Sequence, residues 1–335
     1  MAVFDPNLRG NLRVMKILVT GGAGYIGSHV IRALQAAGHQ AVALDDMSFG
    51  VKSRLGETEL VQFDLADHDA REKLKALFTS QAIDGVIHLA ARKSVAESVA
   101  KPEYYYRQNI DSVLNILEAM KEVGLKKLVF SSSAATYGSP EVDLVDEDYL
   151  CRPINPYGET KLIGEWLIAN ATKAWGLKAV ALRYFNVAGA GFSDLADTSV
   201  ANLIPIALNA IKTNTPVQVF GTDWPTIDGS CVRDYIHVSD LADAHVVALD
   251  YLDRENQPHQ VFNVGTGTGS SVLQVVQALK EVTGLDFAVN LTDRRPGDPA
   301  ALAADVSRIR QTLGWQAKYN LMDIVESAYQ ASLNQ

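Results

Sequence analysis

Lys16-Ile17-Leu18-Val19-Thr20 runs directly into Gly21-Gly22-Ala23-Gly24-Tyr25-Ile26-Gly27, and a helical pattern follows over residues 28–37. The first run is short, apolar and β-branched, which predicts a buried parallel strand. Glycines between such a strand and a helix allow a tight turn and let the backbone approach a pyrophosphate, which the helix N-terminus attracts. A plain tight turn accounts less well for glycines in this context. The stretch therefore predicts a dinucleotide-binding fold.

A second predicted strand, Ala41-Val42-Ala43-Leu44, ends in Asp45-Asp46. Asp45 follows Gly24 by 21 residues. An acidic side chain at this place accepts a ribose 2′-hydroxyl and repels a 2′-phosphate, so we expect NAD rather than NADP. A solvated loop charge is the weaker alternative for Asp45.

Strands and helices continue to alternate as far as residue 186. We expect strands at residues 60–63, 85–89, 127–130 and 178–183, and helices at residues 66–79, 102–123 and 156–175. This order is typical of an α/β fold with a Rossmann-type doubly wound parallel sheet.

The pattern is mixed beyond residue 186, with predicted helices at residues 199–212, 239–252, 271–283 and 321–333. We expect a smaller mixed α/β C-terminal domain there that binds the substrate. The predicted boundaries are 1–14 for a poorly ordered N-terminal extension, 15–186 for mainly the dinucleotide-binding domain and 187–335 for mainly the substrate domain. Some elements of the last part are expected to return to the first sheet.

Composition narrows the function classes. The 335 residues are 47% hydrophobic and 21% charged, with a net charge of −9, which argues against nucleic acid as the main partner. The two cysteines, Cys151 and Cys231, suggest no disulfide framework and therefore a reducing, cytoplasmic location. No apolar run is long enough for a membrane span, and residues 1–14 do not have the pattern of a signal peptide.

Asn155-Pro156-Tyr157-Gly158-Glu159-Thr160-Lys161 predicts a helix start that carries a tyrosine and a lysine. Asn155 suits the N-cap and Pro156 the first turn. Tyr157 and Lys161 then share one helix face, and the ammonium is expected to lower the tyrosine pKa from its ordinary value of about 10. Such a tyrosine carries protons near neutral pH. For an isolated pair, an exposed tyrosine and a solvated lysine remain the alternative.

Other unusual loops also follow predicted strands, at Asp64, Ala90, Ser133 and Asn186. The carboxyl ends of parallel strands meet at one edge of a sheet, where ligands bind. We therefore expect these loops to converge on one site. In the second half, Arg233 and Arg295 suit a diphosphate, although surface salt bridges explain them equally well.

Together with the Tyr-x-x-x-Lys helix and the Ser-rich loop 131–138, three stretches resemble the extended short-chain dehydrogenase/reductase superfamily. They are VTGGAGYIGSH at residues 19–29, LRYFN at residues 182–186 and GTDWPTIDGSCVRDYIHV at residues 221–238. Within the superfamily the resemblance is greatest to the 4-epimerases of UDP-glucose and UDP-galactose, and it extends from about Met15 to the C-terminus.

The resemblance implies a set of site residues. The implied catalytic residues are Tyr157, Lys161 and Ser133. The implied NAD contacts are Gly21, Gly24, Tyr25, Ile26, Gly27, Asp45, Asp46, Met47, Ser48, Phe49, Gly50, Asp64, Leu65, Leu89, Ala90, Ala91, Arg92, Lys93, Asn109, Ser133, Tyr157, Lys161 and Phe185. The implied UDP-sugar contacts are Lys93, Ser133, Tyr157, Asn186, Asn202, Leu203, Gln218, Val219, Phe220, Arg233, Arg295, Asp298 and Leu302. No metal is implied.

The implied reaction is epimerisation through a 4-keto sugar. Tyr157 removes the O4 proton and returns it, while a hydride moves from C4 to tightly bound NAD and back. Ser133 aligns the hydroxyl or relays the proton. Dehydratases of the superfamily carry an acidic pair where this chain has Ala134 and Ala135, which favours epimerisation.

Leu302 occupies the position that limits sugar size in these enzymes. A bulky tyrosine there restricts relatives to glucose and galactose, and smaller residues admit N-acetyl sugars. Leucine is intermediate, so UDP-N-acetylglucosamine and UDP-N-acetylgalactosamine remain alternative substrates, and a simple core role for Leu302 is also open.

Other functions remain open at this point. They are 4-epimerisation of another UDP-sugar such as a uronic acid, a net oxidoreductase that releases NADH, and a non-catalytic NAD(H) sensor. The sensor is disfavoured because Tyr157, Lys161 and Ser133 are all present. The resemblance also implies a homodimer that packs residues 102–123 and 156–175 into a four-helix bundle.

Overall fold

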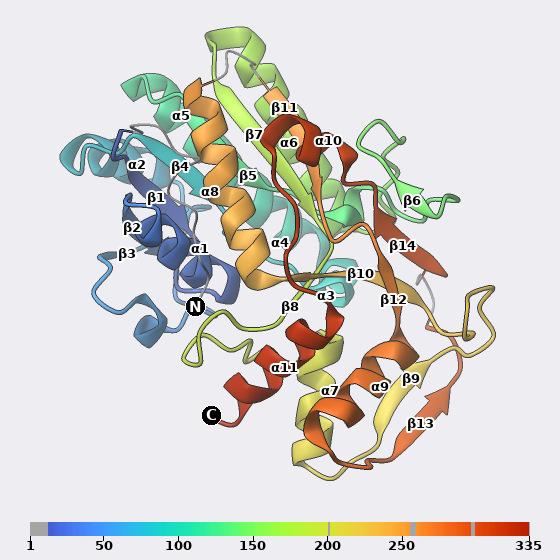
Figure 1. Ribbon diagram of the computed structural model, residues 1–335. Coiled ribbons are helices and arrows are strands. Elements are labelled where there is room, and N and C mark those ends of the chain that lie inside the picture. Colours follow the sequence, from blue (N-terminus) through green and yellow to red (C-terminus); the bar gives the residue numbers. More distant parts are fainter. Residues whose placement is uncertain (1–12, 200–201, 255–258, 296–298, 335) are drawn as a thin grey trace.

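The computed structural model describes residues 13–199, 202–254, 259–295 and 299–334. A seven-stranded parallel sheet forms its centre, in the order β11-β7-β5-β4-β1-β2-β3 (Figure 1). The strands are β1 (Lys16–Thr20), β2 (Gln40–Asp45), β3 (Leu60–Gln62), β4 (Gly85–His88), β5 (Lys127–Ser131), β7 (Lys178–Tyr184) and β11 (His259–Val264). The strand order reverses between β1 and β4, which is where a doubly wound sheet opens a ligand crevice.

Helices cover both faces of this sheet. One face carries α1 (Tyr25–Ala36) and α8 (Val238–Arg254), and the other carries α2 (Ala70–Ser80), α5 (Ser112–Val123) and α6 (Pro156–Trp175). Alternate strand residues face the two layers: Ile17 and Val19 pack with α1 and α8, whereas Leu18 packs with α2 and α5. Burial on both faces explains why these strands are continuously apolar.

The helix expected at residues 102–123 is one continuous rod with an irregular middle. It consists of α4 (Pro102–Tyr106), a π-helical turn at Arg107–Asp111 and α5. The short helix α3 (Val95–Ala100) precedes it, and both α3 and α4 contact α6.

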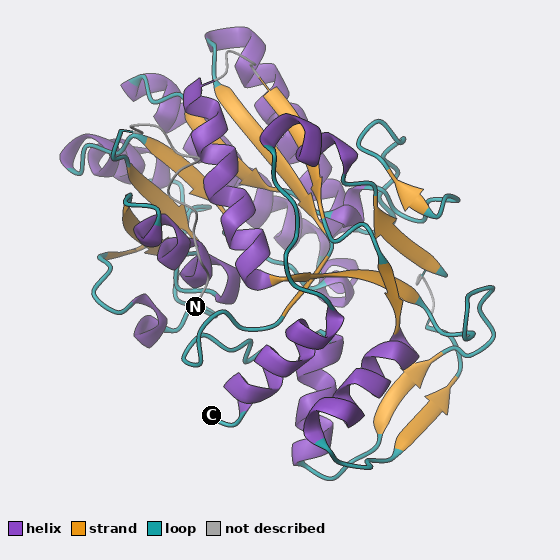
Figure 2. Cartoon of the chain, in the orientation of Figure 1, coloured by secondary structure: helices purple, strands orange, loops and turns teal. Residues whose placement is uncertain are grey.

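A second, smaller region lies beside the carboxyl ends of the central strands (Figure 2). Its mixed sheet contains β6 (Leu144–Val145), β8 (Asn186–Ala188), β10 (Val232–His237), β12 (Gly269–Ser271) and β14 (Ala301–Ala304). A parallel pair, β9 (Val217–Phe220) and β13 (Val289–Thr292), packs with α7 (Leu203–Lys212), α9 (Val272–Thr283) and α11 (Leu321–Ser332). The remaining helix, α10 (Ser307–Leu313), contacts α8 and β11.

The two regions are interleaved along the chain. The late strand β11 pairs with β7 in the central sheet, and α8 lies against α1. Strand β10 pairs with both β8 and β14, so it joins the end of the first region to the last strand of the second.

The predicted fold class is confirmed, with differences in particular elements. The helix expected from residue 66 begins at Ala70, because Asp64 accepts the Ala66 N–H and the chain turns first. The helix expected from residue 199 begins at Leu203, which places Pro205 in its first turn, where proline is tolerated. The short strands β6, β8, β12, β13 and β14 were not predicted.

None of the helices in the described ranges has the length and apolarity that crossing a bilayer requires.

Candidate active site

The glycine loop makes a turn that side chains would block. Gly21 has φ +68°, and a Cβ on Gly27 would lie 2.1 Å from the Gly21 carbonyl oxygen. Helix α1 begins immediately afterwards, and its N-cap, Gly24, contributes no side-chain cap. The backbone N–H groups of the first turn therefore fit a bound diphosphate, which interacts favourably with the positive end of the helix dipole.

Asp45 lies at the carboxyl end of β2, beside this loop. Its carboxylate accepts the N–H groups of Ala23 at 3.1 Å and Met47 at 2.9 Å, and burial raises its pKa. A Cβ on Gly50 would come within 2.7 Å of that carboxylate, so the loop closes tightly around Asp45. This placement fits a ribose hydroxyl donating to the remaining lone pairs of the carboxylate.

Arg92 connects the turn after β4 to the loop after β2. Its guanidinium pairs with Asp46 at 2.7 Å, donates to the Ser48 hydroxyl at 2.5 Å and lies 5.6 Å from the centre of the Phe49 ring. The arginine charge next to the ribose position is thus neutralised by Asp46, which fits NAD better than a phosphorylated dinucleotide.

Asn109 lies in the π-helical turn and joins two parts of the site. Its side chain exchanges hydrogen bonds with the Arg92 backbone, at 2.8 and 3.0 Å, and donates to the Thr160 hydroxyl at 3.0 Å. The π-turn changes the register of the helix so that Asn109 points inward, and π-turns often occur at functional sites. After the end of β3, Asp64 accepts the Ala66 N–H and accepts a hydrogen bond from the Gln108 side chain at 3.2 Å.

The start of α6 is formed as expected, with the Asn155 side chain accepting the Gly158 N–H at 2.9 Å. This places Tyr157 and Lys161 side by side against the end of β5, where both are buried. The Tyr157 hydroxyl shares a hydrogen bond with the Ser133 hydroxyl. Lys161 Nζ donates to the Ser131 carbonyl at 2.8 Å and lies 6.0 Å from the centre of the Tyr157 ring.

The predicted lowering of the Tyr157 pKa is wrong for this arrangement. Burial raises the Tyr157 pKa, and the hydrogen bond from Ser133 only partly opposes it. Burial also lowers the Lys161 pKa to about 8, against a smaller raising effect of Glu165. Lys161 is directed toward the Ser131 carbonyl, and desolvation of the phenol outweighs its influence on Tyr157.

The residues expected at the sugar lie next to the serine loop. Phe185 and Leu302 pack with Ala134 and Tyr137 in one small apolar cluster. Strand β10 pairs with both β14 and β8. Leu302 on β14 lies opposite Arg233, and Asn186 on β8 lies opposite Tyr235. Leu302 therefore contacts the apolar residues beside Ser133 and is not simply part of a remote core.

The residues expected at the nucleotide are more widely spread. The Arg295 guanidinium lies 4.7 Å from the centre of the Phe220 ring, whereas Gln218 is half-exposed on β9. Val219 is buried in the apolar core under α7 and α9. Asn202 donates to Asp197 at 3.2 Å, and Leu203 begins α7. Asp298 and residues 1–12 of the expected N-terminal extension lie outside the described residues.

A model of the "NAD dependent epimerase/dehydratase family" matches residues 17–265. The chain belongs to this family.

Curated relatives and solved structures agree with the assignment. The chain is 46% identical to the UDP-glucose 4-epimerase of Azospirillum brasilense over 96% of this chain and 93% of that relative. It matches the UDP-glucose 4-epimerase of Brucella ovis in complex with NAD with a TM-score of 0.90 and 39% identity, covering 94% and 98% of the two chains. The UDP-Glc/GlcNAc 4-epimerase of Campylobacter jejuni is 40% identical with a TM-score of 0.84, covering 96% and 100%.

These findings confirm the superfamily resemblance and NAD as the cofactor. The glycine loop, the end of β2 and the tyrosine–lysine helix are the parts of this epimerase/dehydratase chain that fit the cofactor.

A buried polar cluster beneath the site was missed in the sequence. It joins Ser132, Glu165 and Arg183, all less than 6% exposed. The available signal was an acidic residue one turn after Lys161 on the same helix face, with an arginine inside a strand that is otherwise apolar.

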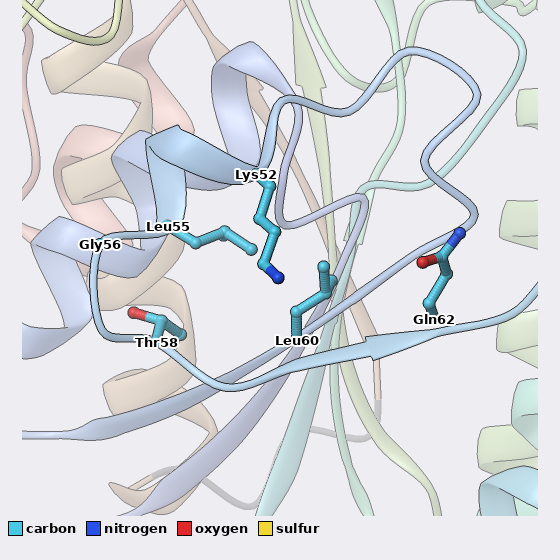
Figure 3. A pocket seen from close by; sticks show the side chains of 6 residues that line it. All are labelled: Lys52, Leu55, Gly56, Thr58, Leu60 and Gln62. Atoms are coloured by element: carbon cyan, nitrogen blue, oxygen red, sulfur yellow. The ribbon is translucent and has the colours of Figure 1, made fainter.

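One pocket lies apart from these residues. It is lined by Lys52, Leu55, Gly56, Thr58, Leu60 and Gln62, between the 3₁₀ turn Lys52–Leu55 and β3 (Figure 3). Strand β3 is at the edge of the sheet, separated from β5 by β2, β1 and β4, and none of the predicted site residues lines this pocket.

Proposed function

We propose that this chain interconverts UDP-galactose and UDP-glucose as a 4-epimerase with tightly bound NAD. The observation that carries the proposal is the contact of Tyr157 with Ser133 beside Lys161, at the ligand edge of an NAD-dependent epimerase/dehydratase fold. Relatives between 41% and 46% identical are UDP-glucose 4-epimerases.

The proton chemistry falls to Tyr157. Its hydroxyl, deprotonated, takes the proton from the sugar O4, and the hydrogen bond with Ser133 places a second hydroxyl that aligns O4 or relays that proton. NAD, held by the glycine loop and Asp45, would supply the acceptor and donor of the hydride at C4, and its positively charged ring would favour the phenolate form of Tyr157. Tyr157 then returns the proton to O4 when the 4-keto sugar has turned its opposite face to the returning hydride, so C4 is inverted without net oxidation.

The serine loop favours epimerisation over dehydration. Ala134 and Ala135 follow Ser133 in a 3₁₀ turn, and Ala134 packs in the apolar cluster with Phe185 and Leu302. A dehydratase needs an acid there to expel a sugar hydroxyl. These two alanines supply none.

We propose the same division of binding residues that the sequence indicates. The glycine loop holds the NAD diphosphate, Asp45 holds the adenine ribose, and Asp64 and Leu65 flank the adenine. Arg233 and Arg295 bind the UDP diphosphate, while Asn186 and Leu302 border the sugar. The two regions divide between cofactor and nucleotide sugar near residue 186.

The range of sugars depends on Leu302. Its side chain packs beside Phe185 and Ala134, so its size sets the room left next to Ser133. UDP-N-acetylglucosamine and UDP-N-acetylgalactosamine are therefore the second candidate substrates, and the relative from Campylobacter jejuni is named as an epimerase of UDP-Glc and UDP-GlcNAc. Comparing turnover of UDP-galactose, UDP-N-acetylgalactosamine and UDP-glucuronate separates these functions.

We also propose a homodimer through α4, α5 and α6. Trp166 on α6 is 57% exposed, and Val99 on α3, which contacts α6, is 63% exposed. Apolar side chains of this size on adjacent helices are typical of an interface. Light scattering after gel filtration should give twice the chain mass, and Trp166→Glu should shift it to the monomer mass.

Cys151 and Cys231, neither of which forms a disulfide, fit a reducing compartment, and we propose the cytoplasm.

The deciding experiment uses the purified protein and UDP-galactose without added NAD. Formation of UDP-glucose supports an epimerase with recycled cofactor. Conversion of only the N-acetyl sugar replaces the substrate, release of NADH in proportion to product indicates a net oxidoreductase, and no conversion of any UDP-sugar with NAD bound indicates a sensor.

A further inference from the structure

Three consecutive residues at the end of β5 each contact helix α6. The Ser131 carbonyl accepts Lys161 Nζ at 2.8 Å, and the Ser133 hydroxyl bonds Tyr157. Between them, the Ser132 hydroxyl donates to Glu165 Oε1 at 2.5 Å. Two of these contacts involve the proposed catalytic groups, whereas the Ser132–Glu165 contact has no part in the proposed chemistry.

Glu165 lies one helical turn beyond Lys161 and is held from the other side by Arg183. The guanidinium donates to both carboxylate oxygens, from Nε at 2.9 Å and from Nη2 at 2.6 Å. Such a two-point contact fixes the carboxylate in position and orientation. Both side chains are at most 6% exposed, so water does not compete for them.

Arg183 is anchored in turn to the serine loop and to the segment after β6. Its Nη1 donates to the Tyr137 hydroxyl at 3.0 Å and to the Glu147 carbonyl at 3.2 Å. The Tyr137 hydroxyl donates to Asn263 Oδ1 at 2.6 Å, on β11. The cluster thus connects β5, α6, β7 and β11 directly beneath the serine loop.

A buried ion pair is a costly way to stabilise a fold, since apolar side chains of the same volume often do as well or better. The Glu165–Arg183 pair is better explained if it orients the segment of residues 131–133 that Glu165 contacts. Lys161 and Tyr157 act only if residues 131 and 133 keep their register against α6.

We propose that Glu165, held by Arg183, is a positioning residue: through the Ser132 hydroxyl it fixes the segment whose neighbouring residues contact Lys161 and Tyr157. The role rests on the proposed epimerase function. It predicts that loss of the Ser132–Glu165 hydrogen bond slows the chemical step and leaves binding of the UDP-sugar and NAD nearly unchanged.

Ser132→Ala removes the hydroxyl oxygen that bonds Glu165 and so tests this contact, and Ser98→Ala is its control. Ser98 is also fully buried, but its hydroxyl donates to the Val95 carbonyl within α3. For Ser132→Ala we expect kcat to fall about tenfold to a hundredfold, because small displacements of reacting groups cost that much. KM for UDP-galactose should stay within about threefold, and NAD content should match that of the unmodified protein. Ser98→Ala should keep its kcat.

A double variant, Glu165→Met with Arg183→Met, separates positioning from stability. Replacing Glu165 alone would leave the Arg183 charge buried and unpaired and risks misfolding, whereas replacing both keeps a well-filled interior. We expect a folded protein with NAD bound and kcat reduced at least as far as in Ser132→Ala.

Unchanged kcat in Ser132→Ala, or in the folded double variant, would overturn the positioning role, as would equal losses in Ser132→Ala and Ser98→Ala. The unmodified protein in the same assay reports on the function itself. No conversion of UDP-galactose there contradicts the proposed function, while equal rates of the unmodified and variant proteins contradict the positioning role alone.

Discussion

Tyr157 must lose a proton although its surroundings oppose it. Burial raises the pKa of Tyr157, and the nearby Lys161 ammonium donates to the Ser131 carbonyl rather than to the phenol. A buried phenol with a hydroxyl partner and a cation within 6.0 Å is poised to ionise only when further positive charge arrives. Burial therefore favours the neutral form of Tyr157, and the positively charged nicotinamide ring of bound NAD would favour the ionised form.

Tyr157→Phe should abolish most turnover without releasing the cofactor. Removing the hydroxyl removes the group that takes and returns the O4 proton, so we expect kcat to fall by about 10²–10⁴-fold. The glycine loop and Asp45 are untouched, so NAD released on denaturation should remain near one per chain. The control is Tyr329→Phe on α11, which should keep its rate, and a near-normal rate for Tyr157→Phe would refute the role of this residue.

Asp45→Asn should weaken NAD binding selectively. Asparagine keeps one oxygen for the Ala23 or Met47 N–H, but it loses the charge that strengthens a hydrogen bond from ribose. Hydrogen bonds to charged groups contribute about 1.5–3 kcal/mol, so affinity should fall roughly tenfold to a hundredfold. Titration of apo-protein with NAD measures this. Asp69→Asn, at an exposed site, should bind normally, and equal affinities of the two variants would argue against a ribose contact.

Helix α6 shows how closely two elements are fitted at this site. A Cβ on Gly158 would lie 2.5 Å from the Ala135 carbonyl oxygen, and a Cβ on Gly164 would lie 2.7 Å from the Phe130 ring. Phe130 is itself buried and lies 5.1 Å from Lys161 Nζ. The two glycines allow α6 to approach β5 closely enough for its side chains to reach residues 131–133.

Gly164→Ala should destabilise the protein, contrary to helix propensity. Alanine favours a helix interior over glycine by about 1 kcal/mol, but overpacking against the fixed Phe130 ring costs about 1–3 kcal/mol. We expect a lower free energy of unfolding in urea. Adding Phe130→Leu should recover part of the loss by making room. A single variant as stable as the unmodified protein would mean that α6 shifts freely on β5.

Local patterns in the sequence predicted the parts of the site that are local. The glycine loop, Asp45 and the Tyr157–Lys161 spacing each lie within one strand–turn–helix segment, so spacing alone places them. The partner of Lys161 was not predictable in this way, because Ser131 is 30 residues away on another element. The same is true of Arg183 and Glu165, whose contact depends on how β7 packs under α6.

At the level of the whole molecule, the central sheet was predictable because its strands are continuous apolar runs. Strands such as β8 and β14, with three and four residues, carry too little pattern to be recognised, yet their pairing with β10 brings Asn186, Arg233 and Leu302 together. Most of the substrate side of the site therefore came from resemblance, whereas the glycine loop, Asp45 and the choice of NAD followed from the residues themselves.

Four buried, neutral histidines should make the stability of the fold depend on pH. Burial lowers the pKa of His29, His237 and His245 to about 4 and that of His88 to about 3. The unfolded chain binds protons on these groups below about pH 6.5, and the folded chain does so only near pH 4 or lower. Stability is therefore complete above about pH 6.5 and falls as the pH drops toward 4, by up to about 1.4 kcal/mol per pH unit for each histidine. Burial raises the pKa values of four carboxyl groups, those of Asp45, Glu147, Asp234 and Asp240, and these groups titrate in the opposite sense and offset part of the loss.

His29→Gln measures the contribution of one buried histidine to this pH dependence. His29 Nδ1 lies 2.8 Å from the Tyr25 carbonyl and Nε2 accepts the Gly191 N–H at 3.0 Å, so the ring joins α1 to the segment after β8 only while it is neutral. Glutamine can still accept that N–H but does not titrate. The free energy of unfolding in urea, measured at several pH values between about 7 and 4, should fall less steeply for His29→Gln, by close to one proton. His68→Gln, at an exposed position, should keep the full slope. Parallel slopes for both variants would show that His29 is protonated equally in the folded and unfolded chains and that its contact with Gly191 survives protonation.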